Sequence, residues 1–215
     1  MSLILSRSEP KVFCIGRNKT GTTSLSKALE DLGYIVGNQA KAELLIQEYA
    51  KREFGPIINY CKKAQAFQDV PFSLPYLYIV LDNAFPDSKF ILSIRKNEAE
   101  WYQSVITFHK NRYGINRRPQ KGDLLSYPYR YTGFIWEVNR IVYGTPENDP
   151  YNERIIKDHY LRHNEDVINY FKFRDNLHIT NLSERGSYQK FCQFLGRKPV
   201  YDDFPWLKKS SEIHK

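Results

Sequence analysis

The sequence predicts an α/β fold from three observations. A strand, a glycine-containing loop and a helix follow one another over residues 11–33. The apolar run KFILSIR at residues 89–95 is typical of a second buried strand, and a stretch with helical periodicity follows it. The length of 215 residues is enough to bury the core of one α/β domain. No internal repeat, low-complexity tract or linker interrupts the chain, so we expect a single domain over residues 1–215.

The segment 11–33 has the layout of an anion-binding element. Residues 12–15 are a continuous apolar run, as in a strand buried on both faces, and Gly33 stands where the following helix should end. A loop between a strand and a helix start directs backbone N–H groups and the positive end of the helix dipole at an anion. Hydroxyl side chains occupy the first helical turn and can add donors: Thr22, Thr23 and Ser24. The segment therefore predicts a cradle for a phosphate or a sulfate.

The other periodic segments predict the rest of the fold. Further strands are expected at residues 34–36, 66–68 and 177–180, and helices at 40–54, from Pro56 onward, at 74–85, 97–109, 152–171 and around Phe191. Residues 109–150 mix basic residues with tyrosines, glycines and prolines, which is typical of a functional lid. Its aromatic side chains could line a pocket for a sugar or ring-bearing substrate, or they could pack onto the core: Tyr127, Tyr129, Tyr131 and Trp136.

Composition limits the class of protein and of ligand. The formal charge of +8 and the pI of about 9.2 favour an anionic ligand, either a charged nucleotide cofactor or a nucleic acid. No nucleic-acid recognition motif is present, so we expect no nucleic-acid partner. Cys14, Cys61 and Cys192 are scattered and odd in number, which predicts neither a disulfide framework nor a zinc site. The first ten residues are too short and polar for a signal peptide, and no run is long enough to span a membrane, so a cytoplasmic location is expected.

The sequence of the anion-binding loop indicates which class of phosphate-containing ligand it holds. Gly16 and Gly21 have the separation of the nucleotide-binding pattern G-x-x-x-x-G-K-[ST], but Thr22 stands where that pattern requires lysine. The lysine of the loop is Lys19, two residues before the second glycine. The stretch NKTGTTS resembles the K-[ST]-G-T-[TS] loop with which sulfotransferases bind the 5′-phosphosulfate of 3′-phosphoadenosine 5′-phosphosulfate (PAPS). The resemblance is to the bacterial-type branch of that family.

Two later stretches extend the resemblance from Lys11 to Trp206. KFILSIR and the helix after it are similar to the sulfotransferase segment that holds the 3′-phosphate, which implies Arg95 and Ser104 in that role. These two residues are nine positions apart instead of the usual eight, so Lys96 could take the place of Arg95. The stretch SERGSYQKFCQFLG resembles the end of the same families, and Arg185 and Gly186 would approach the 3′-phosphate there.

The resemblance implies a P-loop, kinase-like three-layer fold with a mainly parallel sheet of about five strands and a helical or irregular lid at 109–150. The implied reaction transfers a sulfuryl group from PAPS to a hydroxyl or amine by in-line attack and releases PAP, without a metal. Lys19 would stabilise the departing oxygen. The cofactor-binding loop would consist of Arg17, Asn18, Lys19, Thr20, Gly21, Thr22, Thr23 and Ser24.

Asp69 is the candidate catalytic base. It ends the strand at 66–68, where ligands of open α/β sheets bind, and many sulfotransferases carry their base in this region. His109 is a second candidate, because it falls one helical turn beyond Val105.

Two other functions remain open on the sequence alone. A nucleotide kinase or NTPase would need a lysine after the second glycine and an acidic strand end for Mg²⁺. The run Ile79–Asp82 imitates such a strand but fits a helix better. A non-catalytic nucleotide-binding module is the third reading. The acceptor, a small molecule or a carbohydrate, and the oligomeric state cannot be read from the residues.

Overall fold

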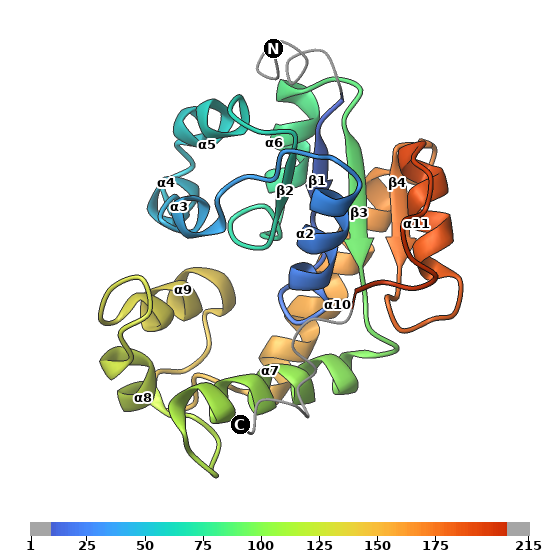
Figure 1. Ribbon diagram of the computed structural model, residues 1–215. Coiled ribbons are helices and arrows are strands. Elements are labelled where there is room, and N and C mark those ends of the chain that lie inside the picture. The colour runs from blue at the N-terminus through green and yellow to red at the C-terminus, as the bar shows by residue number, and fades with distance from the viewer. Residues whose placement is uncertain (1–9, 206–215) are drawn as a thin grey trace. The chain divides into compact units, whose positions relative to one another are not determined.

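A computed structural model describes residues 10–205 (Figure 1). The chain divides into two compact units. Within the described residues, the first holds 10–95 and 164–205, and the second holds 96–163. The expectation of one domain over the whole chain stays a prediction. Trp206, where the sequence resemblance ends, and the first nine residues lie outside the described part.

The first unit is built on a parallel sheet. Its strands are β1 (Val12–Cys14), β2 (Ala66–Gln68), β3 (Lys89–Ser93) and β4 (Leu177–Thr180). They lie in the order β2-β1-β3-β4, and all three pairings are parallel (Figure 1). In the register, Cys14 lies between Gln68 and Ile91. The predicted α/β class is confirmed, with four strands in the described residues instead of about five.

The strand expected at 34–36 does not form. Only Val36 makes a bridge, to Ala66 in β2. The side-chain oxygen of Gln65 accepts the Ile35 N–H at 2.9 Å, so a side chain takes a donor that a strand ladder would use. Gly33 just before this segment has a left-handed backbone, with φ of +87°. This segment is therefore a connection that runs along the sheet edge, with backbone hydrogen bonds between Ile35 or Gly37 and residues 65–66, but with a single bridge instead of a strand.

The helices of the first unit follow the sequence with two differences. They are α2 (Thr22–Asp31), α3 (Gln39–Glu43), α4 (Ile46–Ala50), α5 (Phe54–Cys61), α6 (Leu77–Ala84) and α11 (Ser187–Leu195). The helix expected at 40–54 is two short helices, α3 and α4, and nothing in the local sequence accounts for the break. The helix expected from Leu74 begins at Leu77, because Pro75 disfavours helical geometry at the residue before it.

Side chains of successive strand residues point to opposite faces of the sheet and form an apolar layer on each face. Val12 and Cys14 point to one face of the sheet, where they join a buried cluster with residues of α2 and α11. Phe13 points to the other face, with its ring centroid 5.4 Å from that of Phe67 and 5.6 Å from that of Phe90. Phe171, at the end of α10 (Glu153–Tyr170), extends this aromatic layer with a ring 4.8 Å from Phe90. The sheet is thus covered on both faces, as parallel sheets require.

The second unit consists of helices. It holds α7 (Glu98–Tyr113), α8 (Lys121–Ser126), α9 (Phe134–Tyr143) and the first part of α10. Trp101 and Tyr160 stack in its core with ring centroids 4.4 Å apart. The 109–150 region is therefore more regular than its composition indicates, and its function as a lid stays a prediction.

The tyrosines of the 109–150 region contact arginines within the same unit. The Arg112 guanidinium lies 4.5 Å from the ring centroid of Tyr129 and 5.9 Å from that of Tyr127. Packing inside the unit thus accounts for both rings, and an acceptor-lining role for them stays a prediction. In the part of the chain that the structure describes, no helix combines the length and apolarity that crossing a membrane requires.

Candidate functional site

The carboxyl ends of the four strands meet at one edge of the sheet. Because all four strands are parallel, the segments that leave them lie along the same edge. The glycine loop leaves β1, Asp69 leaves β2 and Arg95 follows β3. Leu182 follows β4 and reaches the glycine loop. The fold therefore collects residues that are far apart in the sequence, all within the first unit.

The glycine loop is pressed against the neighbouring segments. A Cβ on Gly16 would overlap the backbone oxygen of Ser93 in β3 and lie 2.6 Å from its nitrogen. Gly21, the N-cap of α2, has a left-handed backbone with φ of +100°, and a Cβ there would lie 2.5 Å from Cδ2 of Leu182. The Thr20 hydroxyl closes the loop, at 2.6 Å from both the Arg17 carbonyl oxygen and the Ser93 hydroxyl. The loop geometry is therefore fixed by β3 and by the segment after β4.

Replacing Gly16 tests this close approach. We expect Gly16→Ala to destabilise the fold by ~1–3 kcal/mol, because the colliding atoms belong to the backbone of a central strand and cannot turn aside. The midpoint of urea unfolding measures the change. Gly55→Ala is the matched control, since Gly55 lies in α5 with nothing within 4 Å of an added Cβ. An unchanged midpoint in Gly16→Ala would contradict the tight loop.

Lys19 and Arg95 meet on the loop. Lys19 has a left-handed backbone, with φ of 65°, and its carbonyl oxygen accepts a hydrogen bond of 2.7 Å from Nε of Arg95. The two sequence segments that were predicted to hold phosphate groups are therefore in direct contact. The first turn of α2 contains no acidic residue, so the helix itself places no negative charge against an anion at its start. The arrangement favours a ligand with more than one anionic group.

Asp69 faces the same loop. It has a left-handed backbone, with φ of 58°, and its Oδ2 accepts a hydrogen bond of 3.1 Å from the Thr22 hydroxyl at the start of α2. Its Oδ1 accepts the Val70 N–H at 2.9 Å. Burial raises the pKa of the Asp69 carboxyl, and this effect outweighs the opposing influence of these hydrogen bonds and of the Arg17 and Lys19 charges. A carboxylate that binds protons more readily than usual, beside an anion loop, suits proton transfer.

The other predicted loop residues differ in exposure. Arg17 is 2% exposed, and its Nη1 donates to the Ser73 carbonyl oxygen at 2.5 Å. Ser24 is buried, Asn18 is half-buried and Thr23 is exposed at the start of α2. The hydroxyls of Thr20 and Thr22 already have partners within the site, whereas the Thr23 side chain faces outward. A direct cofactor contact by any of these side chains stays a prediction.

The segment after β4 contains the last two predicted cofactor-binding residues, Arg185 and Gly186. Leu182 is buried against Gly21, and Gly186 caps α11 with a left-handed backbone. Arg185 is exposed just before this cap. A role for Arg185 and Gly186 in cofactor binding stays a prediction.

The remaining predicted site residues belong to the second unit. Ser104 is buried on α7, at 7% exposure. His109 lies on the same helix, where its Nδ1 is 2.8 Å from the Tyr151 hydroxyl and its ring stacks on Tyr113. The 3′-phosphate role of Ser104 and the alternative base role of His109 stay predictions.

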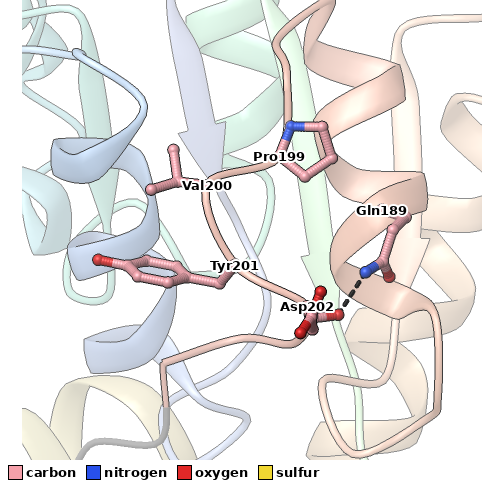
Figure 2. Close-up of a pocket in the computed structure, with 5 residues that line it drawn as sticks. All are labelled: Gln189, Pro199, Val200, Tyr201 and Asp202. Carbon is pink, nitrogen blue, oxygen red and sulfur yellow. Dashed lines mark hydrogen bonds between the residues drawn. The ribbon is translucent and has the colours of Figure 1, made fainter.

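A surface hollow elsewhere on the first unit contains none of the predicted site residues. It is lined by Gln189, Pro199, Val200, Tyr201 and Asp202 (Figure 2). The Gln189 amide donates to the Asp202 carbonyl oxygen across it, and the Tyr201 hydroxyl donates to Asp31 of α2 at 2.8 Å. This hollow arises where the chain after α11 packs back on the helices. It is open and shows no convergence of charged groups.

Sequence reasoning missed three residues that shape the site. Ser93 supports the loop from β3, Leu182 packs on Gly21, and the Ser73 carbonyl holds the Arg17 side chain. Ser93 lies two positions before Arg95, so its place at a strand end was a usable signal. The other two contacts join segments more than fifty residues apart and leave no local pattern.

Comparison with known protein families decides the class. A family model described as Sulfotransferase domain matches residues 11–213. The chain belongs to the sulfotransferase domain family. A search of curated proteins gave no match to this member of the family. Among residues 10–205 of this sulfotransferase-family protein, no three His, Cys, Asp or Glu side chains gather in a way that could hold a metal ion.

Proposed function

We propose that this protein transfers a sulfuryl group from PAPS to a hydroxyl or amine of an acceptor and releases PAP. The family points to sulfotransferase chemistry. The observation that carries the proposal to PAPS is the hydrogen bond from Arg95 to the Lys19 carbonyl, at 2.7 Å. It supports a binding site for a donor with two separate anionic groups, because it joins a strand-end arginine to a phosphate loop. PAPS has a 5′-phosphosulfate and a 3′-phosphate.

The residues present fit such a donor. The loop amides from Arg17 to Thr22, with Thr23 and Ser24, would hold the 5′-phosphosulfate at the start of α2. Arg95 would hold the 3′-phosphate, and Arg185 and Gly186 would add to it. PAPS supplies an activated sulfuryl group, and no metal is needed for its transfer. Within the loop the two glycines let the backbone pack directly against Ser93 and Leu182, which fixes the loop that would hold the donor.

Two side chains would carry the reaction. Asp69 would accept the proton of the acceptor hydroxyl or amine while the acceptor atom forms a bond to sulfur. The bond from sulfur to the phosphate oxygen of PAP would break, and Lys19 would stabilise the negative charge that remains on that oxygen. The hydrogen bonds of Asp69 to Thr22 and to the Val70 N–H hold the carboxyl beside the loop. His109 is the alternative base.

A nucleotide kinase or NTPase is less well supported. The position of the nucleotide-binding lysine is Thr22, whose hydroxyl donates to Asp69. Asp82, the other candidate acidic residue, lies in α6 instead of at a strand end. Both of its carboxyl oxygens accept hydrogen bonds of 2.6 Å from Arg174. The chain therefore lacks the lysine that such enzymes place after the second glycine, and Asp82 does not end a strand.

Thermal stabilisation by nucleotides separates these functions. We expect PAP at ~100 times its Kd to stabilise the fold by ~2.7 kcal/mol, a rise in Tm of roughly 5–10 °C, and ATP with Mg²⁺ to do much less. The larger shift with ATP and Mg²⁺ would favour the kinase. Transfer of label from [³⁵S]PAPS to a panel of alcohols, phenols, amines and sugars then separates an enzyme from a binding module. The same panel would identify the acceptor class, a small molecule or a carbohydrate.

A further inference from the structure

The segment 69–76 connects the candidate base to α6, and side chains of other elements hold it at four residues. Its first residue, Asp69, accepts the Thr22 hydroxyl at 3.1 Å, and the Val70 carbonyl oxygen accepts from Gln39 of α3 at 2.7 Å. Its middle is held by Arg17, whose Nη1 donates to the Ser73 carbonyl oxygen at 2.5 Å. Near its end, the Tyr49 hydroxyl of α4 donates to the Pro75 carbonyl oxygen at 3.2 Å. Two of these four hydrogen bonds therefore come from the phosphate loop and the helix that begins there.

The segment has a conformation that needs such support. Asp69 and Tyr76, at its two ends, both have left-handed backbones, with φ of 58° and 51°. Residues other than glycine rarely adopt this conformation, and they keep it only where the surrounding structure holds them. Loss of one of these hydrogen bonds should therefore let the backbone of the segment change conformation and displace the Asp69 carboxyl.

Arg17 is built into the loop in an unusual way. Its backbone belongs to the turn whose N–H groups face an anion, but its side chain is 2% exposed and reaches the opposite segment. A buried guanidinium is costly unless its donors are satisfied, so its place is selected by these contacts. Its charge also acts on Asp69, where it opposes the rise in pKa that burial causes. Lys19 and the Thr22 hydroxyl act on the carboxyl in the same direction as Arg17, as does the Val70 N–H.

We propose that Arg17 is a positioning residue that transmits anion binding on the phosphate loop to the segment 69–76 and so places the Asp69 carboxyl for proton transfer. The inference rests on the proposed function, because it needs a cofactor on the loop and a base at Asp69. An anion that orders the loop amides fixes the Arg17 backbone, and the Arg17 side chain then fixes Ser73. Binding of the donor thereby places the base that takes the proton of the acceptor.

Hydrogen exchange with and without PAP tests the coupling. In the wild type, we expect PAP to slow amide exchange in peptides covering 69–76 by about tenfold or more, along with exchange in the loop itself. In Arg17→Gln, PAP should still slow exchange in the loop, but the slowing in 69–76 should be lost. Arg17→Lys, which keeps a donor and a charge, should restore part of it.

A matched control removes the side-chain hydrogen bond to Pro75. Tyr49→Phe deletes the hydroxyl that donates to Pro75 but keeps the ring that stacks on Tyr76. It should raise exchange in 69–76 without PAP, yet the slowing caused by PAP should remain. The ratio of exchange rates with and without PAP therefore distinguishes a coupling residue from one that only packs.

A pH series gives a second readout. A carboxylate beside the loop opposes phosphate binding, so PAP affinity should weaken as pH rises through the pKa of Asp69. Arg17→Gln removes a charge that holds this pKa down, so the pH at which affinity weakens should move upward. Asp69→Asn should abolish this contribution and leave only the titration of PAP itself.

The outcomes separate the two proposals. Failure of PAP to bind the wild type would overturn the proposed function. PAP binding to the wild type with unchanged exchange in 69–76, or with the same slowing in Arg17→Gln, would overturn the positioning role and leave the proposed function standing. Should Arg17→Gln not fold, Arg17→Lys decides by the same ratio, because an undiminished slowing of exchange in 69–76 in that variant would overturn the positioning role.

Discussion

Lys19→Ala should lower sulfuryl transfer by ~10²–10³-fold, the usual cost of removing one preorganised charge that stabilises the transition state. Lys19 lies on the loop, where its carbonyl oxygen accepts the Arg95 hydrogen bond, and its ammonium would face the bridging oxygen on which charge appears as PAP departs. That charge is smaller in the bound donor, so we expect the Kd for PAPS to rise by less than tenfold. Turnover with [³⁵S]PAPS and calorimetric titration with PAPS in the absence of acceptor measure the two effects separately.

Lys27→Ala is the matched control for this charge. Lys27 lies on α2, the helix that follows the loop, and pairs with Asp31 one turn later at the surface. Its removal changes the net charge equally but takes away an exposed pair worth ~0–1 kcal/mol, so turnover should stay within about twofold of the wild type. A Lys19→Ala enzyme as fast as Lys27→Ala would remove Lys19 from the chemistry and point to the loop amides as the main stabilising group.

The parts of the fold that the sequence predicted are those with a strong local pattern. The strand at residues 12–14, the loop and α2 were predicted because an apolar run, two spaced glycines and a helical repeat adjoin one another. The strand KFILS was equally clear. Residues 34–36 look like a strand in composition, but the Gln65 side chain takes a backbone donor there, and a single-sequence pattern does not show which partner a backbone group will find.

The residues of the candidate site that directly follow a strand could be predicted from the sequence. Asp69 and Arg95 follow strands, and the parallel sheet brings them to the loop. Which atoms meet was not predictable, because contacts such as that of Arg17 with the Ser73 carbonyl depend on tertiary packing across more than fifty residues. A buried arginine in a loop looks like an exposed anion-binding arginine in the sequence.

Asp69→Asn should lower turnover by ~10²–10⁴-fold if Asp69 is the base, because the amide cannot accept the acceptor proton. The amide oxygen can still accept the Thr22 hydroxyl, so the loop should keep its geometry, and PAP should bind at least as tightly as to the wild type because the carboxylate charge is gone. In the wild type, the rate should fall as pH drops through the pKa of Asp69, which burial sets above the usual range for aspartate. In Asp69→Asn this acid limb should vanish. Retained turnover with the acid limb intact would assign the base to another group, with His109 the first to replace.

The same substitution should make the protein more stable at neutral pH. Because the folded pKa of Asp69 is raised above the unfolded value, the folded state binds more protons between the two, and stability falls as pH rises through that window. Above the window the charged carboxylate therefore weakens the fold, and Asp69→Asn should raise the Tm at pH 7 while matching the wild type at pH 3. A side chain that costs stability where it is charged, and sits beside the loop for the donor, is better explained by chemistry than by packing. A lower Tm at pH 7 would instead make Asp69 a structural cap of the segment 69–76.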